Sequence, residues 1–178
     1  TTTPGFYING VYASEEIIYG EEAPNLPQDG QTIINLADWS EINLYINEEK
    51  LNLVKGQILE YKRELDLEQG VLNRRLVWED RQGRKIEIKI TRLISLSREH
   101  VGAIRYQFKA VNFTGKISVN SAINGDVTNH HHLRDKKALE VLESEVDTNT
   151  GHLLHRVKST NFEVAYVVEH LMDDYSKE

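Results

Sequence analysis

The sequence contains no cysteine, one methionine and only three prolines in 178 residues. Without cysteine, disulfide bonds and thiolate chemistry are excluded, and a reducing compartment is permitted, so we expect a cytoplasmic protein. No apolar run approaches the roughly 20 residues that a membrane-spanning helix requires, and residues 1–10 do not resemble a signal peptide. We therefore expect no membrane partner. The chain also lacks a glycine-rich loop of the kind that cradles phosphate.

Positive charge is also scarce. Aspartate and glutamate outnumber lysine and arginine by 28 to 21, which gives a net charge of -7. Nucleic acids require a cationic face, so a nucleic-acid partner is disfavoured. Apolar residues make up 39% of the chain, and a chain of this length can bury a substantial core. We expect one domain over residues 1–178.

Turn residues divide the chain at regular intervals. Residues 20–30 (GEEAPNLPQDG) form a loop by composition, and later turn signals recur about every eight to twelve residues, as in a sandwich or barrel. No segment keeps a helical period over three turns. The expected fold is an all-β antiparallel sandwich. Its expected strands are residues 6–12, 32–36, 42–46, 51–54, 58–67, 71–79, 85–96, 101–113, 116–123, 139–146, 152–158 and 162–171.

The hairpin over residues 71–96 shows how the pattern predicts register. Apolar residues alternate on both strands, and the two apolar faces coincide only if the loop between them has an odd number of residues. A three-residue loop, 81–83, satisfies this and places Gly83 where a positive φ is required. The expected pairs are Trp78–Ile86, Leu76–Ile88 and Arg74–Ile90.

Two arginines, Arg74 and Arg92, share the apolar faces of this hairpin. A buried arginine must be paired, and Asp66 and Asp80 are the candidate partners. The alternative is a contact with a ligand. Trp78 alternates with core leucines, so we expect it in the core rather than at a sugar site.

Five segments of the chain, in order, are residues 4–12 (PGFYINGVY), 34–39 (INLADW), 63–74 (RELDLEQGVLNR), 92–96 (RLISL) and 121–129 (SAINGDVTN). Together they resemble the N-terminal domain of glycoside hydrolase family 65, which includes maltose, trehalose and kojibiose phosphorylases. Two departures are visible: Ala37 stands where the family has proline, and Asn124 where it has aspartate.

The resemblance implies a large two-sheet sandwich, a super-sandwich similar to the galactose mutarotases, truncated at both ends. The catalytic (α/α)6 barrel would follow downstream, so no catalytic residue is expected in this chain. The parent would be an inverting phosphorylase with a glutamic acid as general acid and inorganic phosphate as co-substrate. Its partners would be its own C-terminal barrel, a disaccharide and a second copy in a homodimer. No other cofactor is implied.

The candidate site residues inside this chain are few. Asn129, His130, His131 and His132 could form a loop at the substrate entrance, or they could be a solvated loop. Adjacent histidines on an extended segment point to opposite faces, so a metal site is not expected. Trp39, at a strand end, could contact a sugar or a neighbouring domain. We expect paired acids in loops, such as Glu21 and Glu22, to be exposed to solvent.

Three functions remain open from the sequence. The chain could be the non-catalytic sandwich domain of a family 65 enzyme that supports the barrel, the entrance and dimerisation. It could instead be a free-standing carbohydrate-binding or mutarotase-like module, which needs a paired histidine and glutamate; His152, His155 and His170 lie on expected strands. It could also be a purely structural interaction domain with a large apolar patch.

Overall fold

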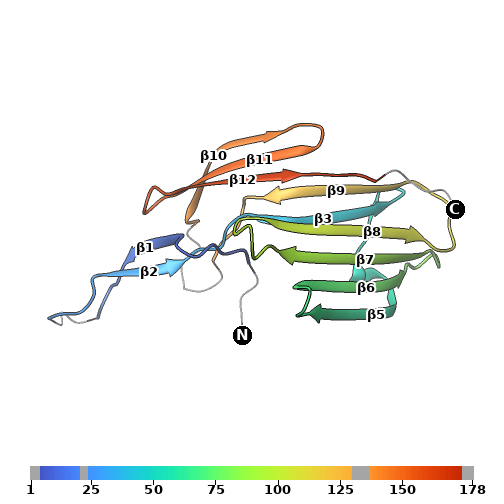
Figure 1. The fold of residues 1–178 in the computed structure, drawn as a ribbon, viewed down its shortest axis with the longest axis horizontal. Coiled ribbons are helices and arrows are strands. Elements are labelled where there is room, and N and C mark those ends of the chain that lie inside the picture. Colours follow the sequence, from blue (N-terminus) through green and yellow to red (C-terminus); the bar gives the residue numbers. More distant parts are fainter. Residues whose placement is uncertain (1–4, 21–23, 130–136, 174–178) are drawn as a thin grey trace. The chain divides into compact units, whose positions relative to one another are not determined.

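The computed structural model describes residues 5–20, 24–129 and 137–173. It divides into two compact units: unit 1 contains Thr1–Glu41 and Ser121–Glu178, and unit 2 contains Ile42–Asn120. Nearly all regular structure is antiparallel strand, and the only helical element described is one 3-10 turn (Figure 1). The predicted all-β class is confirmed. Within the described part of the chain, no helix has the length and apolar character needed to cross a bilayer.

The elements follow one another in a simple order. In unit 1 the strands are β1 (Tyr12–Glu16), β2 (Asp29–Ile33), β10 (Leu139–Val146), β11 (Thr150–Val157) and β12 (Glu163–Glu169). In unit 2 they are β4 (Glu49–Lys50), the 3-10 turn η1 (Leu53–Lys55), β5 (Gln57–Asp66), β6 (Val71–Glu79), β7 (Lys85–Ile94) and β8 (Gly102–Ala110). The chain passes from one unit to the other within β3 (Asp38–Ile46) and within β9 (Ile117–Asn124).

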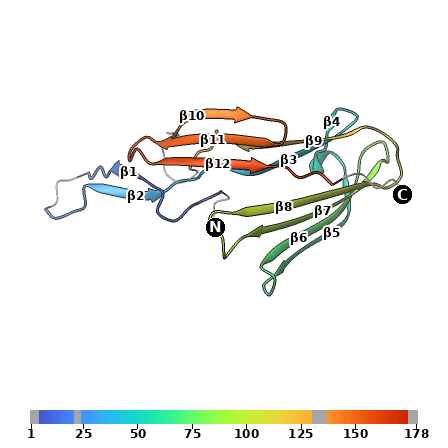
Figure 2. The same cartoon turned by 45° about the horizontal axis from the view of Figure 1, so that its top comes forward.

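The main sheet of unit 2 has the order β5-β6-β7-β8, with every neighbouring pair antiparallel (Figure 2). The predicted hairpin register is confirmed, because Trp78 pairs with Ile86, Leu76 with Ile88 and Arg74 with Ile90. The turn between β6 and β7 is closed by Asp80 N–H donating to the Arg84 carbonyl at 3.0 Å. Gly83 has φ 78°, as a three-residue turn of this kind requires.

The core of unit 2 lies on one face of this sheet. Trp78 is only 5% exposed, which confirms that it belongs to the core. Period-two alternation places its strand neighbours Leu76 and, across the turn, Ile86 and Ile88 on the same face. Leu44 and Ile46 of β3 pack against this row, so the core is a two-layer one. The buried members are Leu44, Ile46, Leu76, Trp78, Ile86, Ile88 and Ile90.

Of the two expected partners of Arg74 and Arg92, Asp80 instead binds Arg84, four residues along the chain. The Arg74 guanidinium lies 6.0 Å from the ring centroid of Tyr61, within cation–π range. Burial raises the pKa of the Tyr106 hydroxyl, and the positive charges of Arg74 and Arg92 oppose that rise. Both arginines are only half-buried, so neither needs the pairing that full burial would demand.

Unit 1 contains a three-stranded sheet of order β10-β11-β12 and the two-stranded β1–β2 ladder. Its core combines residues from both ends of the sequence, because Ile34 and Leu36 pack with Leu139, Val157 and Val164. A bulge between Val141 and Glu143 shifts the β10–β11 register. An exposed hydrogen bond also links β1 to the turn after β11, because Ser14 N–H donates to the Ser159 hydroxyl at 2.9 Å.

Two expected strands are wrong. In residues 6–12 only Phe6 forms a bridge, to Leu36, and β1 begins at Tyr12. The Asn9-Gly10 pair makes a turn, with Gly10 at φ 93° and Val11 N–H bonded to the Ile8 carbonyl. The expected strand 51–54 gives way to η1.

Asn52 explains η1. Its side-chain oxygen accepts from Val54 N–H at 2.9 Å. This local hydrogen bond competes with a strand ladder and favours a tight turn.

Gly56 packs closely against the β6 residues Trp78 and Glu79, and its substitution tests this packing. A Cβ at Gly56 would lie 2.3 Å from the Glu79 carbonyl oxygen and 2.5 Å from Trp78 Cε2. We expect Gly56→Ala to lower the free energy of unfolding by about 1–3 kcal/mol, since the backbone cannot move aside freely. Urea unfolding measures this. At Gly20 a Cβ meets no atom of the described residues within 4 Å, so Gly20→Ala is the matched control, and equal losses in the two variants would contradict the assignment.

Candidate functional site

The structure places one of the four predicted loop residues, Asn129; His130, His131 and His132 lie outside the described residues. The Asn129 side chain is half-buried and bonds to the backbone at the end of β2 and just after it. Its Oδ1 accepts from Asn35 N–H at 2.6 Å, and its Nδ2 donates to the Ile33 carbonyl at 3.0 Å. Both ends of the amide are therefore used within the protein.

Asn35 is the centre of the same network. Its Oδ1 accepts from Phe6 N–H at 2.9 Å, and its Nδ2 donates to the Thr128 carbonyl at 3.3 Å. The close approach explains Gly5, because a Cβ there would lie 2.4 Å from Asn35 Oδ1. We call Phe6, Asn35, Trp39, Thr128 and Asn129 the asparagine cluster.

Trp39 opens β3 at the edge of this cluster. It is half-buried, and its ring centroid lies 5.2 Å from that of Phe6, with the rings tilted by 48°. Aromatic pairs at this separation attract one another beyond the area that they bury. Trp39 thus packs on Phe6 with one part of its ring and leaves another part accessible. Three sequence segments that carried the family resemblance, residues 4–12, 34–39 and 121–129, meet in the asparagine cluster.

A second feature of unit 1 is a histidine without partners. His155 on β11 is 0% exposed, and neither ring nitrogen has a hydrogen-bond partner among the described residues. Its ring packs edge-on against Tyr166 at 5.4 Å between centroids. Gly125 lies against the ring, since a Cβ there would be 2.8 Å from His155 Nε2. Burial lowers the pKa of His155, so it is held neutral.

These positions do not favour the mutarotase-like alternative. His155 is sealed from solvent and cannot touch a sugar, whereas His152, three residues earlier on β11, is exposed. His170 Nδ1 lies 3.2 Å from the Asn149 carbonyl oxygen and donates to it when this nitrogen carries the ring proton. Among the residues that the structure describes, no three histidine, aspartate or glutamate side chains gather closely enough to hold a metal ion.

Comparison with known proteins decides the family. The sequence matches the family model described as glycosyl hydrolase family 65, N-terminal domain, over residues 1–178. The chain belongs to family 65. This confirms the resemblance carried by its five sequence segments, three of which the structure joins in the asparagine cluster.

Two curated relatives show how much of a family 65 protein this domain represents. It is 36% identical over 185 residues to an α,α-trehalose phosphorylase of Thermoanaerobacter brockii, covering 99% of this chain and 24% of the relative. It is 31% identical over 150 residues to a kojibiose phosphorylase of Caldanaerobacter subterraneus subsp. tengcongensis, covering 83% of this chain and 18% of the relative. The chain spans a quarter or less of the length of these relatives.

A solved structure supports the fold. It is assigned as a kojibiose phosphorylase from the human microbiome, and it superposes with a TM-score of 0.82 at 22% identity. The match covers 96% of this chain and 22% of that one. The sandwich of this family 65 domain is therefore the fold found within a larger protein.

Sequence reasoning found Asn129 but missed Asn35 as its partner. Both lie in segments that carried the resemblance, and an asparagine in each was the available signal. The buried state of His155 was also missed. Its strand alternates Leu153, His155 and Val157 on one face, and that parity indicates burial.

The asparagine cluster gives a stability prediction. Removing the Asn129 amide leaves the Ile33 carbonyl and Asn35 N–H without their partner, so we expect Asn129→Ala to lower the free energy of unfolding by about 1–3 kcal/mol. Urea unfolding followed by circular dichroism measures the loss. Asn120→Ala, at an exposed position of β9, is the control and should change stability little. A neutral Asn129→Ala variant would refute the structural role.

His155 gives a prediction about pH. The unfolded chain binds a proton at this histidine near the ordinary pKa of 6.5, while the folded chain resists protonation because the charged ring would be buried. The unfolded state therefore holds more protons, and the free energy of unfolding falls as the pH drops through about 6.5 and below.

Denaturant unfolding between about pH 5 and pH 8 tests this window. We expect His155→Leu to flatten the pH dependence, because the group that takes up the proton is gone. His152→Leu removes an exposed histidine from the same strand and should keep the original slope. Identical slopes in the native chain and the His155→Leu variant would contradict the assignment.

Proposed function

We propose that this domain is the non-catalytic β-sandwich of a glycoside phosphorylase that acts on α-glucosidic disaccharides. The observation that carries the proposal is the family match over the whole chain, together with relatives named as trehalose and kojibiose phosphorylases. The interior of the domain agrees with a non-catalytic role. Its one fully buried ionisable residue, among those described, is a histidine packed against an aromatic ring and a glycine.

The chemistry would be performed elsewhere in the parent protein. Inverting cleavage needs an acid that protonates the glycosidic oxygen and a nucleophile on the opposite face of the sugar. In the proposed enzyme inorganic phosphate is that nucleophile. The acid and the phosphate site would lie on an (α/α)6 barrel that follows this domain. The parent would act in the cytoplasm, as a homodimer whose sandwich domain helps the two copies associate.

The asparagine cluster would position the substrate entrance. Asn129 is fixed to the end of β2 and the residues just after it by two hydrogen bonds, and His130, His131 and His132 follow it directly in the sequence. A loop that starts from a fixed residue loses less entropy when it contacts a ligand. Trp39, at the edge of the same cluster, offers a partly accessible ring for a sugar or for the neighbouring domain.

The first test separates this domain from the enzyme. We expect the purified chain, given phosphate and trehalose, kojibiose or maltose, to release no hexose 1-phosphate, whereas the parent protein releases it from one of the three. A coupled assay for hexose 1-phosphate measures both. Turnover by the isolated chain would overturn the non-catalytic assignment, and an inactive parent would overturn the phosphorylase assignment.

The second test concerns the loop. In the parent protein, replacing His130, His131 and His132 together by alanine should raise KM with kcat changed less than about twofold, since the loop would contribute binding equally to substrate and transition state. Lys137→Ala, an exposed position just beyond the loop, is the control. An unchanged KM would show that the loop is only solvated.

A further inference from the structure

Unit 2 contains a pocket of about 270 Å³ that the proposed function does not use. Three connections surround it: the β3–β4 turn with β4, the η1 segment, and the β6–β7 turn. Its volume lies near the lower end for small-molecule sites, roughly 300–1,000 Å³. The lining residues are Ile46, Glu49, Lys50, Leu51, Asn52, Lys55, Trp78, Asp80, Arg81, Gln82 and Arg84.

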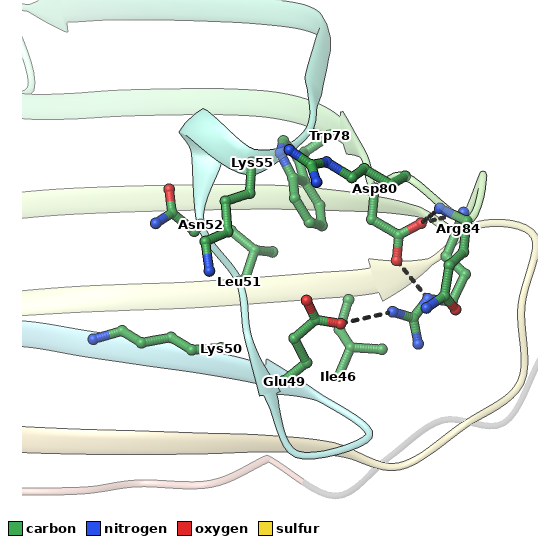
Figure 3. Close-up of a pocket in the computed structure, with 11 residues that line it drawn as sticks. Ile46, Glu49, Lys50, Leu51, Asn52, Lys55, Trp78, Asp80 and Arg84 are labelled. Atoms are coloured by element: carbon green, nitrogen blue, oxygen red, sulfur yellow. Dashed lines mark hydrogen bonds and ion pairs between the residues drawn. The ribbon is translucent and has the colours of Figure 1, made fainter.

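One side of the pocket is a chain of ion pairs. Arg84 donates through Nε to Asp80, and its Nη2 lies 3.5 Å from Glu49 Oε2 (Figure 3). Burial raises the pKa of the Asp80 carboxyl, but the hydrogen bonds from the Arg84 backbone, the Arg84 guanidinium and Gln82 N–H outweigh it and hold the pKa below its usual value. Asp80 therefore stays charged, and the β6–β7 turn is bound to the residue that begins β4.

The floor of the pocket is apolar. Ile46 is 2% exposed, and Leu51 packs on the same core. The indole of Trp78 stands between Lys55 and Asp80 in Figure 3. Its Nε1 is buried, with no hydrogen-bond partner among the described residues. A buried donor without a partner is uncommon in a folded protein.

The remaining lining groups are cationic or neutral. Within the described residues, Lys50, Lys55 and Arg81 have no ion-pair or hydrogen-bond partner on their side chains. With Arg84, the pocket has four cations against the two carboxylates Glu49 and Asp80, so its lining carries two more positive charges than negative ones. The amides of Asn52 and Gln82 add donors and acceptors suited to hydroxyl groups.

We propose that this pocket binds a phosphorylated hexose. A phosphate monoester carries about two negative charges near neutral pH, which matches the excess positive charge of the lining. Lys55 and Arg81 would hold the phosphate, the amides would meet ring hydroxyls, and the apolar floor would cover one face of the ring. Binding here does not depend on the proposed function; only the link to phosphorolysis, whose product is a hexose 1-phosphate, does.

Two other ligand classes fit less well. A neutral sugar would leave the cations unmatched. A nucleic acid would need an extended cationic surface with exposed aromatic rings for stacking, whereas the chain has a net charge of -7 and the pocket's one aromatic ring is buried. Free phosphate and a phosphorylated hexose share the same anionic group. Titration with each compound separately distinguishes these two ligands.

The experiment is calorimetric titration of the chain with glucose 1-phosphate, inorganic phosphate and glucose. We expect saturable binding of glucose 1-phosphate at least about tenfold tighter than that of either fragment, weakening as salt is added. Lys55→Glu and Arg81→Glu should each weaken it by about tenfold or more, because a charge-assisted hydrogen bond is lost and a repulsion gained. Lys62→Glu, an exposed reversal on β5 of unit 2, should change it by less than about twofold.

The indole resonances add a readout independent of affinity. The chain has two tryptophans, and glucose 1-phosphate should shift the Trp78 N–H signal while leaving that of Trp39 in place. The proposal would be overturned if inorganic phosphate or glucose bound as tightly as glucose 1-phosphate. It would also be overturned if Lys62→Glu weakened binding as much as Lys55→Glu or Arg81→Glu, or if the Trp78 signal did not shift. Binding that persists in a parent without phosphorylase activity would overturn only the proposed function.

Discussion

The Asp80 carboxylate fixes the turn on which unit 2 depends. It accepts hydrogen bonds from Gln82 N–H at 2.8 Å and Arg84 N–H at 2.9 Å, and it pairs with the Arg84 guanidinium. The turn it closes has an odd number of residues, and side chains alternate with a period of two. A slip of one residue would turn Trp78 and its whole strand away from the core. One carboxylate therefore sets the register of the hairpin, the composition of the core and one wall of the pocket.

In unit 1, asparagine side chains satisfy backbone groups that lie outside the strand ladders. Its core joins the two ends of the sequence, and the connecting segments leave backbone groups that no strand pairs. Buried backbone groups must be satisfied, and the amides of Asn35 and Asn129 satisfy them across 94 residues of sequence. Each amide offers an N–H donor and a carbonyl acceptor on separate atoms, whereas an aspartate carboxylate only accepts at neutral pH. This geometry accounts for the position of asparagine in two of the segments shared with family 65.

Local patterns predicted the parts of the fold that local physics determines. The alternation of Trp78 and Leu76 opposite Ile86 sufficed for the register, because parity and loop length leave one solution. The strand predicted over residues 51–54 is wrong, because the Asn52 side chain forms a local hydrogen bond that the apolar pattern does not reveal. The asparagine cluster and the pocket could not be predicted, since each is made by segments distant in sequence that come together only when the sheets form.

The pocket also shows the limit of net charge as an argument. A chain with a charge of -7 was expected to avoid polyanions, and for an extended partner that reasoning holds, because it meets the whole surface. A small anion meets only nearby charges, since exposed charges farther than about 8–10 Å are screened at physiological salt. In the pocket the carboxylates of Asp80 and Glu49 are occupied by Arg84, and the charges left over are positive. The charge of the pocket is thus opposite in sign to the net charge of the chain. Which ligand a site prefers follows from which of its charged groups are already paired.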